Sequence, residues 1–288
     1  MGDDRVWRLR GGELRFPPSR AVGIVNVTDD SFFAGARSGT PGRAVAAGLE
    51  LVASGFDLLD VGAVAARSGP PVPAGDEIAR LAPAVERLAA SSGVPVIADT
   101  FSAPAAAAAL GAGAAAVNDI SGAADPALLE LIADSGCGYV LMHIEGPPRV
   151  DRRPRPRDDP VAEVGGWLAD RIEAAVAAGI AAEQIAIDPG LDFDLTVDDD
   201  LEILRRLGEL RSLGRPLYLA LSRKDFLGAV LAGSWEGREP PERREWATAA
   251  ATALAVNAGA ELLRLHDRSA LDAMRVAEAI ARPEVAVG

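Results

Sequence analysis

The stretch Pro95–Asp119, PVIADTFSAPAAAAALGAGAAAVND, decides the fold of this chain. Two short apolar runs, Pro95–Ala98 and Ala114–Val117, enclose an alanine-rich stretch, and glycine marks the return to the second run. Continuously apolar strands that alternate with helices are typical of a parallel sheet buried on both faces. Each run ends in a polar pair, Asp99-Thr100 and Asn118-Asp119. The stretch therefore predicts a β-α-β unit with polar groups at its strand ends.

The same unit recurs along the chain. Six further apolar runs lie at Val22–Val25, Asp57–Val61, Tyr139–Met142, Ile185–Ile187, Pro216–Leu221 and Glu261–Leu265. Helical spacing is found at Ala44–Ala53, Asp76–Ala90, Pro160–Ala178, Asp198–Leu210 and Glu245–Ala258. Eight units without a linker predict a single-domain (β/α)8 TIM barrel over residues 1–288, with residues 1–20 as an N-terminal extension. An open doubly wound sheet is disfavoured because no G-x-G-x-x-G follows the first strand.

Composition narrows the class of protein. The 288 residues carry 42 acidic against 29 basic side chains, a net charge of -13, which argues against nucleic acid as a partner. The single cysteine excludes an internal disulfide. No run approaches the roughly 18 apolar residues of a membrane span, and the first residues do not resemble a signal peptide. We therefore expect a cytoplasmic enzyme that binds neither nucleic acid nor membrane.

Every predicted strand ends in a polar side chain, where a barrel carries its chemistry. The strand-end groups include Asn26, Asp60, Asp99, Asn118, His143, Asp188, Ser222, Lys224, Arg264 and His266. Arg264 and His266 alternate around Leu265, so both face the barrel mouth, where Arg67 and Lys224 can join them in an anion site. Carboxylates and an amide suit the ring edge of a nitrogen-rich heterocycle. We predict a pocket for a heterocycle that carries a phosphate group.

Structural roles compete with this interpretation. Asp60 or Asp119 would serve equally well as a helix N-cap, Ser222 as a cap for the helix that follows, and His143 as a core histidine. The segment 146–160, GPPRVDRRPRPRDDP, reads as a solvated linker or as a substrate lid. Zinc is disfavoured, since two histidines and one cysteine show no ligand spacing.

Taken in order, the strand-end motifs resemble those of the dihydropteroate synthase family, from about Val22 to Pro283. The matching segments are GIVNVTDDSF at 23–32, DVG at 60–62, DT at 99–100, VND at 117–119, LMH at 141–143, DPG at 188–190, SRK at 222–224 and RLHD at 264–267. The resemblance implies a pterin-binding TIM barrel, usually a homodimer. Such enzymes join 6-hydroxymethyl-7,8-dihydropterin pyrophosphate to p-aminobenzoate in folate biosynthesis and release pyrophosphate.

The resemblance also implies a role for each matching residue. Asp99, Asn118 and Asp188 would hold the pterin ring, with Lys224 on its carbonyl side. Arg67, Arg264 and His266 would bind the pyrophosphate, and Asn26 would place a Mg2+ ion on it. Catalysis would rest on Lys224, Asp99, Arg264 and His266. The remaining residues expected to bind substrate are Met142, Phe193, Ser222 and Asp225.

Three loops depart from the family pattern on the acceptor side. Residues 62–69 read GAVAARSG instead of G-G-E-S-T-R-P-G, residues 192–195 read DFDL instead of G-F-G-K, and Asp225 replaces a serine. Asp225 would place a carboxylate near that of p-aminobenzoate, a repulsion of roughly 1 kcal/mol or more.

These departures leave three hypotheses, in order of preference. The first is a working, sulfonamide-insensitive synthase with a remodelled acceptor pocket. The second is an enzyme that uses another amine, and the third is a non-catalytic pterin-binding paralogue. A corrinoid-dependent methyltransferase is less favoured, because it has less need of the pair Arg264 and His266.

Overall fold

A computed structural model describes residues 5–27, 41–66, 69–150 and 154–281, and it forms a barrel. The barrel strands are β3 (Arg20–Asn26), β4 (Leu58–Gly62), β5 (Val96–Asp99), β6 (Ala116–Asp119), β7 (Gly138–Met142), β8 (Ile185–Asp188), β9 (Tyr218–Ala220) and β10 (Leu262–Leu265). They pair in parallel in the order β8-β7-β6-β5-β4-β3-β10-β9. A parallel bridge between Ile187 and Leu217 joins the two ends of this sheet. The predicted single-domain TIM barrel is confirmed.

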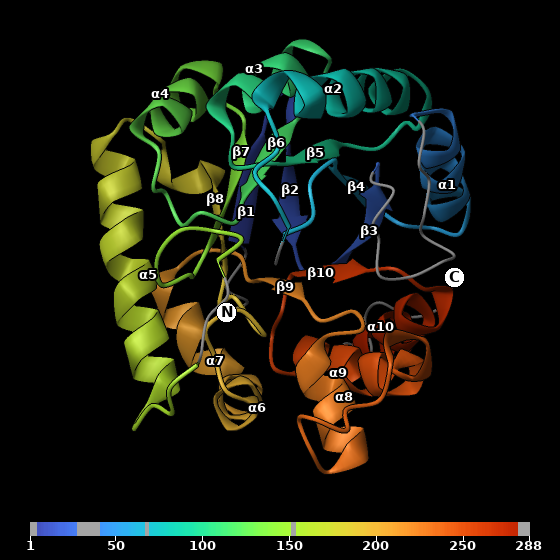
Figure 1. The fold of residues 1–288 in the computed structure, drawn as a ribbon, viewed down its shortest axis with the longest axis vertical. Coiled ribbons are helices and arrows are strands. Elements are labelled where there is room, and N and C mark those ends of the chain that lie inside the picture. Colours follow the sequence, from blue (N-terminus) through green and yellow to red (C-terminus); the bar gives the residue numbers. More distant parts are fainter. Residues whose placement is uncertain (1–4, 28–40, 67–68, 151–153, 282–288) are drawn as a thin grey trace.

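Helices surround the strands on all sides of the barrel (Figure 1). They are α1 (Pro41–Ala53), α2 (Ala74–Ser91), α3 (Ala103–Gly111), α4 (Pro126–Ser135), α5 (Pro160–Ala177), α6 (Val197–Arg205), α7 (Leu207–Leu210), α8 (Asp225–Ala232), α9 (Glu245–Asn257) and α10 (Arg268–Ala281). The helix predicted over Asp198–Leu210 is broken at Arg206, so that part of the prediction is wrong. No helix in the described part of the chain is long and apolar enough to cross a bilayer.

Side chains alternate along each strand between the helices and the barrel interior. The outward set, which includes Val61, Ala98 and Leu141, packs in the large core beneath the helices. The inward set begins with an apolar layer that includes Leu58, Ile97, Val140 and Leu262. This alternation with a period of two follows from strand geometry. The next inward-facing residue of each strand therefore lies nearer the carboxyl-terminal end of the barrel, which we call the mouth.

A β-hairpin closes the amino-terminal end of the barrel. Strands β1 (Arg5–Leu9) and β2 (Gly12–Phe16) form an antiparallel pair within the part predicted only as an extension. Trp7 is fully buried against the apolar layer, and its indole nitrogen donates to the carbonyl of Gln184 at 2.7 Å. Truncating such a side chain costs about 3–5 kcal/mol, so the hairpin is part of the core.

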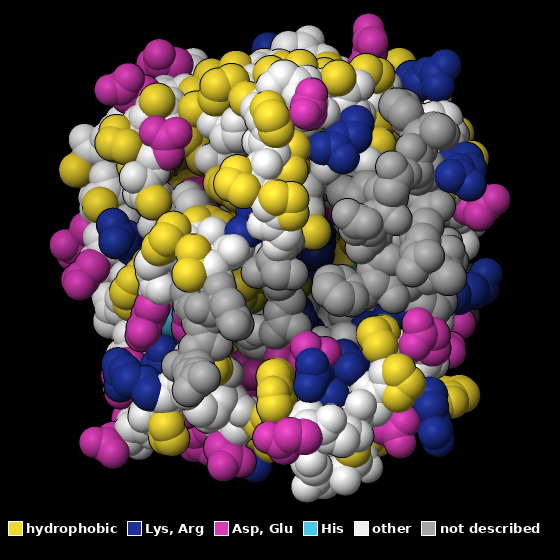
Figure 2. Space-filling model, in the orientation of Figure 1, with side chains coloured by type: hydrophobic (Ala, Val, Ile, Leu, Met, Phe, Trp, Pro, Cys, Tyr) yellow, Lys and Arg dark blue, Asp and Glu magenta, His cyan; other side chains and the backbone are white. Residues whose placement is uncertain are grey.

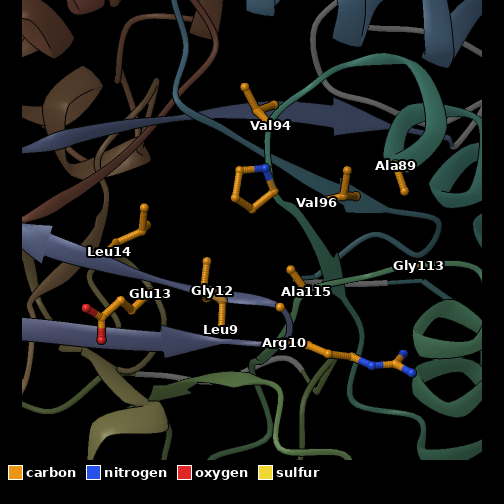
Figure 3. Close-up of a pocket in the computed structure, with 12 residues that line it drawn as sticks. Leu9, Arg10, Gly12, Glu13, Leu14, Ala89, Val94, Val96, Gly113 and Ala115 are labelled. Atoms are coloured by element: carbon orange, nitrogen blue, oxygen red, sulfur yellow. The ribbon is translucent and has the colours of Figure 1, made fainter.

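A pocket of about 270 Å³ lies beside this hairpin (Figure 3). It is lined by the hairpin turn at Leu9–Leu14 and by the residues that precede or begin β5 and β6, such as Val94 and Ala115. These lie at the amino-terminal strand ends, whereas barrel enzymes react at the carboxyl-terminal ends. The pocket therefore lies at the opposite end from the predicted site.

Candidate active site

Three predicted pterin-side residues and Met142 come together in the layer above the apolar one. In the sheet register, Asp99 of β5 lies beside Asn118 of β6, and Asp188 of β8 lies beside Met142 of β7. Asn118, Met142 and Asp188 are buried. The barrel thus gathers short polar groups from three strands in one low-dielectric layer, with an apolar neighbour for a planar ring.

Asp60 is the centre of a hydrogen-bond network that the sequence interpretation missed. Its buried Oδ2 accepts from Asn118 Nδ2 at 3.1 Å, from the Tyr218 hydroxyl at 3.0 Å and from Arg264 Nε. Asp60 therefore faces the barrel interior, and the N-cap alternative is wrong for it. Its position two residues after the inward-facing Leu58 is the signal that places it in the site.

Arg264 lies between two carboxylates. Besides its bond to Asp60, it donates from Nη2 to Asp99 Oδ2 at 2.7 Å. Burial lowers the pKa of Arg264, but the attraction of Asp60 and Asp99 outweighs burial and raises it above its ordinary value. Arg264 thus stays charged while it orients the Asp99 carboxylate.

The pKa values of the two acidic pterin-side residues are raised toward neutral pH. Burial, assisted by the negative charge of Asp60, raises the pKa of Asp99 to about 7 against the attraction of Arg264. Burial likewise raises the pKa of Asp188 to about 6, against the backbone N–H of Gly190 and the charge of Lys224. Hydrogen bonds from ligand N–H groups would compensate the cost of keeping these buried carboxylates charged.

Lys224 lies at the start of α8 and reaches back over the loop after β8. Its Nζ donates to the carbonyl of Leu191 at 3.1 Å and lies 4.6 Å from the ring centroid of Phe193. The same ammonium group acts electrostatically on both Asp99 and Asp188. The structure therefore brings Lys224 and Phe193 to the pterin-side residues.

His266 is a neutral hydrogen-bonding group. Its Nδ1 lies 2.9 Å from the hydroxyl of Ser222, whose oxygen also accepts from the His266 backbone N–H. Burial and the nearby charge of Arg264 lower the pKa of His266 to about 3. His266 therefore contributes to the predicted anion site as a neutral group and not as a cation, and Ser222 orients the imidazole as the partner of Nδ1.

An apolar cluster lines the same mouth. Ile120, Met142 and Ile144 are buried together, and Ala66, Phe101 and Phe193 pack against them. Ala66 belongs to the loop that departs from the family pattern. The loop has thus become part of an apolar wall.

The charge of Asp225 is paired. Its Oδ1 accepts from Arg244 Nη1 at 2.6 Å and lies 3.4 Å from Arg238 Nε. Attraction by two guanidinium groups offsets the repulsion expected between this carboxylate and p-aminobenzoate. The prediction that Asp225 weakens acceptor binding assumed an unneutralised charge, and that assumption is wrong.

Asp119, His143 and part of the segment 146–160 have structural roles. Asp119 accepts from the backbone N–H groups of the loop residues Ser121 and Ala123 and from the Tyr139 hydroxyl. The N-cap of the following helix α4 is Asp125, so the N-cap alternative is wrong for Asp119 as well. His143 is a buried core residue that packs edge-on against Trp167. In the segment 146–160, buried Arg157 binds Glu145 and Asp199, so this part of it is not a solvated linker.

Two predicted positions mark the limit of the described site. Asn26 ends β3 and is half-buried at the mouth. Arg67, like residues 28–32 of the first motif, lies outside the described residues.

Charged side chains of both signs lie around and within the mouth. Figure 2 shows acidic and basic side chains around the outline of one face, and side chains of both kinds are also visible nearer its middle. Ion pairs within the mouth, such as Arg264 with Asp99 and Arg223 with Asp267, keep cations beside carboxylates there. The net charge of -13 therefore does not describe the interior of the site.

Comparison with known proteins decides the family. The sequence profile described as pterin binding enzyme matches residues 22–266. A dihydropteroate synthase of Mycobacterium leprae is 43% identical over 272 residues, which cover 91% of this chain and 94% of that protein. The chain belongs to the dihydropteroate synthase family.

Solved dihydropteroate synthase structures share its whole architecture. The Xanthomonas albilineans enzyme with 4-aminobenzoic acid is 38% identical, with a TM-score of 0.86 over 99% of this chain and 100% of that one. The Yersinia pestis enzyme in a sulfonamide drug complex is 31% identical, with a TM-score of 0.88 over 96% and 98%. The altered loops of this family member therefore leave the barrel unchanged.

Proposed function

We propose that this chain joins 6-hydroxymethyl-7,8-dihydropterin pyrophosphate to p-aminobenzoate and releases pyrophosphate. The observation that carries the proposal is one barrel mouth that holds both halves of the required chemistry. Asp99, Asn118 and Asp188 form the ring-edge half, and Arg264 and His266 form the leaving-group half, with Lys224 beside the ring. The pairing of Asp225 with Arg244 removes the main objection to p-aminobenzoate as the acceptor.

The geometry supports a dissociative mechanism. The bond between the pterin methylene carbon and the pyrophosphate oxygen breaks first, and its electron pair leaves with pyrophosphate. Buried Asp99 and Asp188 stabilise the pterin cation that remains, while Arg264 and the His266 N–H stabilise the leaving group. The arylamine nitrogen then attacks the methylene carbon and loses a proton.

The residues present fit a Mg2+ ion that arrives with the pyrophosphate. No group of three or more His, Cys, Asp or Glu residues suited to a metal occurs in the described part of the chain. Mg2+ commonly uses one or two protein oxygens together with substrate phosphates and waters, and Asn26 offers an amide oxygen at the end of β3. Bound there, the ion would neutralise charge on the leaving group.

Pyrophosphate release measured with and without p-aminobenzoate tests the activity. We expect release only with this amine, together with formation of dihydropteroate. Release that requires a different amine would support the second hypothesis instead. Tight pterin binding without release under any of these conditions would favour the non-catalytic paralogue.

We further propose a reduced affinity for sulfonamides. Ala65 and Ala66 stand where the family pattern has serine and threonine, and Ala66 packs into the apolar cluster of the mouth. A sulfonamide that mimics p-aminobenzoate would therefore find fewer hydroxyl partners here. Inhibition constants of this enzyme and of its Ala65→Ser/Ala66→Thr variant test the idea; we expect the variant to bind the drug more tightly, and equal constants would contradict it.

The proposed oligomeric state is a homodimer formed by an exposed apolar surface, the α9–α10 face. Trp246 and Leu254 of α9 are 78% and 70% exposed, and Val276 and Ile280 of α10 are 60% and 77% exposed. The two helices pack against each other, and within each helix the two exposed residues are four or eight positions apart, which places them on one face. An exposed apolar surface of this kind is typical of an interface, and a two-fold axis lets the same surface cover itself.

A further inference from the structure

Asp192 caps a helix that is not its own. Helix α8 begins at Asp225, and its N-cap position is Lys224, whose side chain makes no capping bond. Asp192, from the loop after β8, accepts from the backbone N–H groups of Asp225 at 2.7 Å and Phe226 at 3.1 Å. These are two of the N–H groups that a helix start leaves without an intrahelical partner.

The Asp192 backbone is fixed as well. Its φ is +71°, a left-handed conformation in which Asp is tolerated more readily than most residues. The Asp192 N–H donates to Asp200 Oδ1 at 3.0 Å, and both side chains are buried. The residue is therefore held from α6 through its backbone and holds α8 through its side chain.

The neighbours of Asp192 both contact the same ammonium group. Leu191 accepts a hydrogen bond from Lys224 Nζ at 3.1 Å, and the ring centroid of Phe193 lies 4.6 Å from that nitrogen. Lys224 itself immediately precedes the capped residues. One carboxylate thus fixes the backbone that carries the lysine relative to the two groups that receive its side chain.

We propose that Asp192 is a positioning residue that holds the Lys224 ammonium against Leu191 and Phe193, where the pterin is to bind. The proposal rests on the proposed function for the identity of the ligand. It assigns a purpose to the aspartate that stands where the family pattern has glycine: the chain gains a cap that glycine cannot supply. Asp225 contributes a backbone N–H to this arrangement, while its carboxylate binds Arg244.

Lys224 is the only lysine in the 288 residues, which permits a direct test. Protein labelled with 13C at lysine Cε gives one lysine methylene signal, and we expect the Phe193 ring to shift it upfield. Asp192→Gly keeps the backbone free to adopt φ +71° but removes the cap, so the signal should move toward that of an exposed lysine. Asp192→Asn retains capping ability and should largely preserve the signal, and Phe193→Leu establishes the contribution of the ring.

Binding of 6-hydroxymethylpterin provides the second readout. We expect Asp192→Gly to weaken it about tenfold, the loss of one typical helix cap. The KM for p-aminobenzoate should change much less. Asp125→Gly is the matched control, because Asp125 caps α4 away from Lys224 by accepting from the N–H of Ala127. It should lower thermal stability while leaving both the lysine signal and pterin affinity intact.

A second pair of variants keeps the proposal testable if Asp192→Gly does not fold. Asp225→Pro removes one N–H that Asp192 accepts, at the first helical position where proline is well tolerated, whereas Asp225→Ser keeps that N–H. We expect the lysine signal to move in the proline variant only. An unchanged signal and affinity in Asp192→Gly, or equal signals in the two Asp225 variants, would overturn the positioning role. Failure of the wild-type protein to bind 6-hydroxymethylpterin would instead refute the proposed function.

Discussion

At the scale of single residues, Asp60 decides how the mouth is organised. One of its oxygens receives donors from β6, β9 and β10, and it shares Arg264 with Asp99. Removing one partner of a buried ion pair leaves the other charge poorly compensated, which costs several kcal/mol. The network therefore affects both stability and the geometry of the pterin side.

Asp60→Asn tests this network. We expect the free energy of unfolding to fall by about 3 kcal/mol and pterin affinity to fall at least tenfold, because Arg264 loses a charged partner. Urea denaturation and ligand titration give the two quantities. Asp57→Asn is the control just before the same strand, where Asp57 accepts from the Ala21 N–H. Normal pterin affinity in Asp60→Asn would refute its role.

Asp188 couples the stability of the ligand-free protein to pH. Because folding raises its pKa from 3.8 to about 6, the folded state binds this proton more tightly than the unfolded chain. Its contribution to stability is fully present below about pH 4 and is lost as the pH rises through about 6. Between pH 4 and 8, the wild type should therefore lose about 2–3 kcal/mol relative to Asp188→Asn. Parallel pH dependences in urea denaturation would contradict this.

At the scale of elements, the start of α8 is held by two other segments of the chain. Asp192 caps it from the loop after β8, and Arg244 contacts it from the start of α9 through Asp225 and the carbonyl of Arg223. The carboxylate of Asp225 lies beside the expected acceptor site and by itself would disfavour p-aminobenzoate. Its charge is neutralised by Arg244, which is 19 residues away in the sequence.

Asp225→Ser distinguishes repulsion from structural pairing. Because Arg244 neutralises Asp225, we expect the KM for p-aminobenzoate to change by less than about threefold, while stability falls by about 1–3 kcal/mol. The double variant with Arg244→Met should be less destabilised than the sum of the single variants. A large improvement in KM would restore the repulsion argument. Steady-state kinetics and urea denaturation provide the measurements.

At the scale of the whole molecule, the barrel separates stability from chemistry. The hairpin and the apolar layer close one end, and the polar network occupies the other. The α9–α10 face lies outside both, on the helical surface. Association through this face would therefore leave the mouth of each copy open.

The dimer prediction is tested on the full chain. The wild type should sediment as a dimer, and Trp246→Glu with Leu254→Glu should sediment as a monomer, because charge on both copies disfavours burial of the apolar face. Val150→Glu is a control at an exposed apolar residue outside the face. A wild type that is monomeric at micromolar concentration, or a dimer unaffected by the double substitution, would refute the proposed interface.

The sequence by itself determined the eight repeated units, the barrel, and which polar side chains end the strands. These features follow from local alternation and from composition, which a linear chain displays directly. It also indicated Lys224 and the pair Arg264 and His266 as candidate site residues, because their scarcity and spacing are visible without coordinates. The amino-terminal hairpin was missed, since its short strands do not repeat the β-α unit.

Only the tertiary structure decided which charges neutralise one another. Arg264 meets Asp60 across 204 residues, and Asp192 meets the start of α8 across 33. Such pairs depend on the order in which the strands close the barrel and on the direction of each side chain, and neither is written in a local pattern. The pKa values of Asp99, Asp188 and His266 follow from the same burial, because the cost of a charge depends on what surrounds it in space.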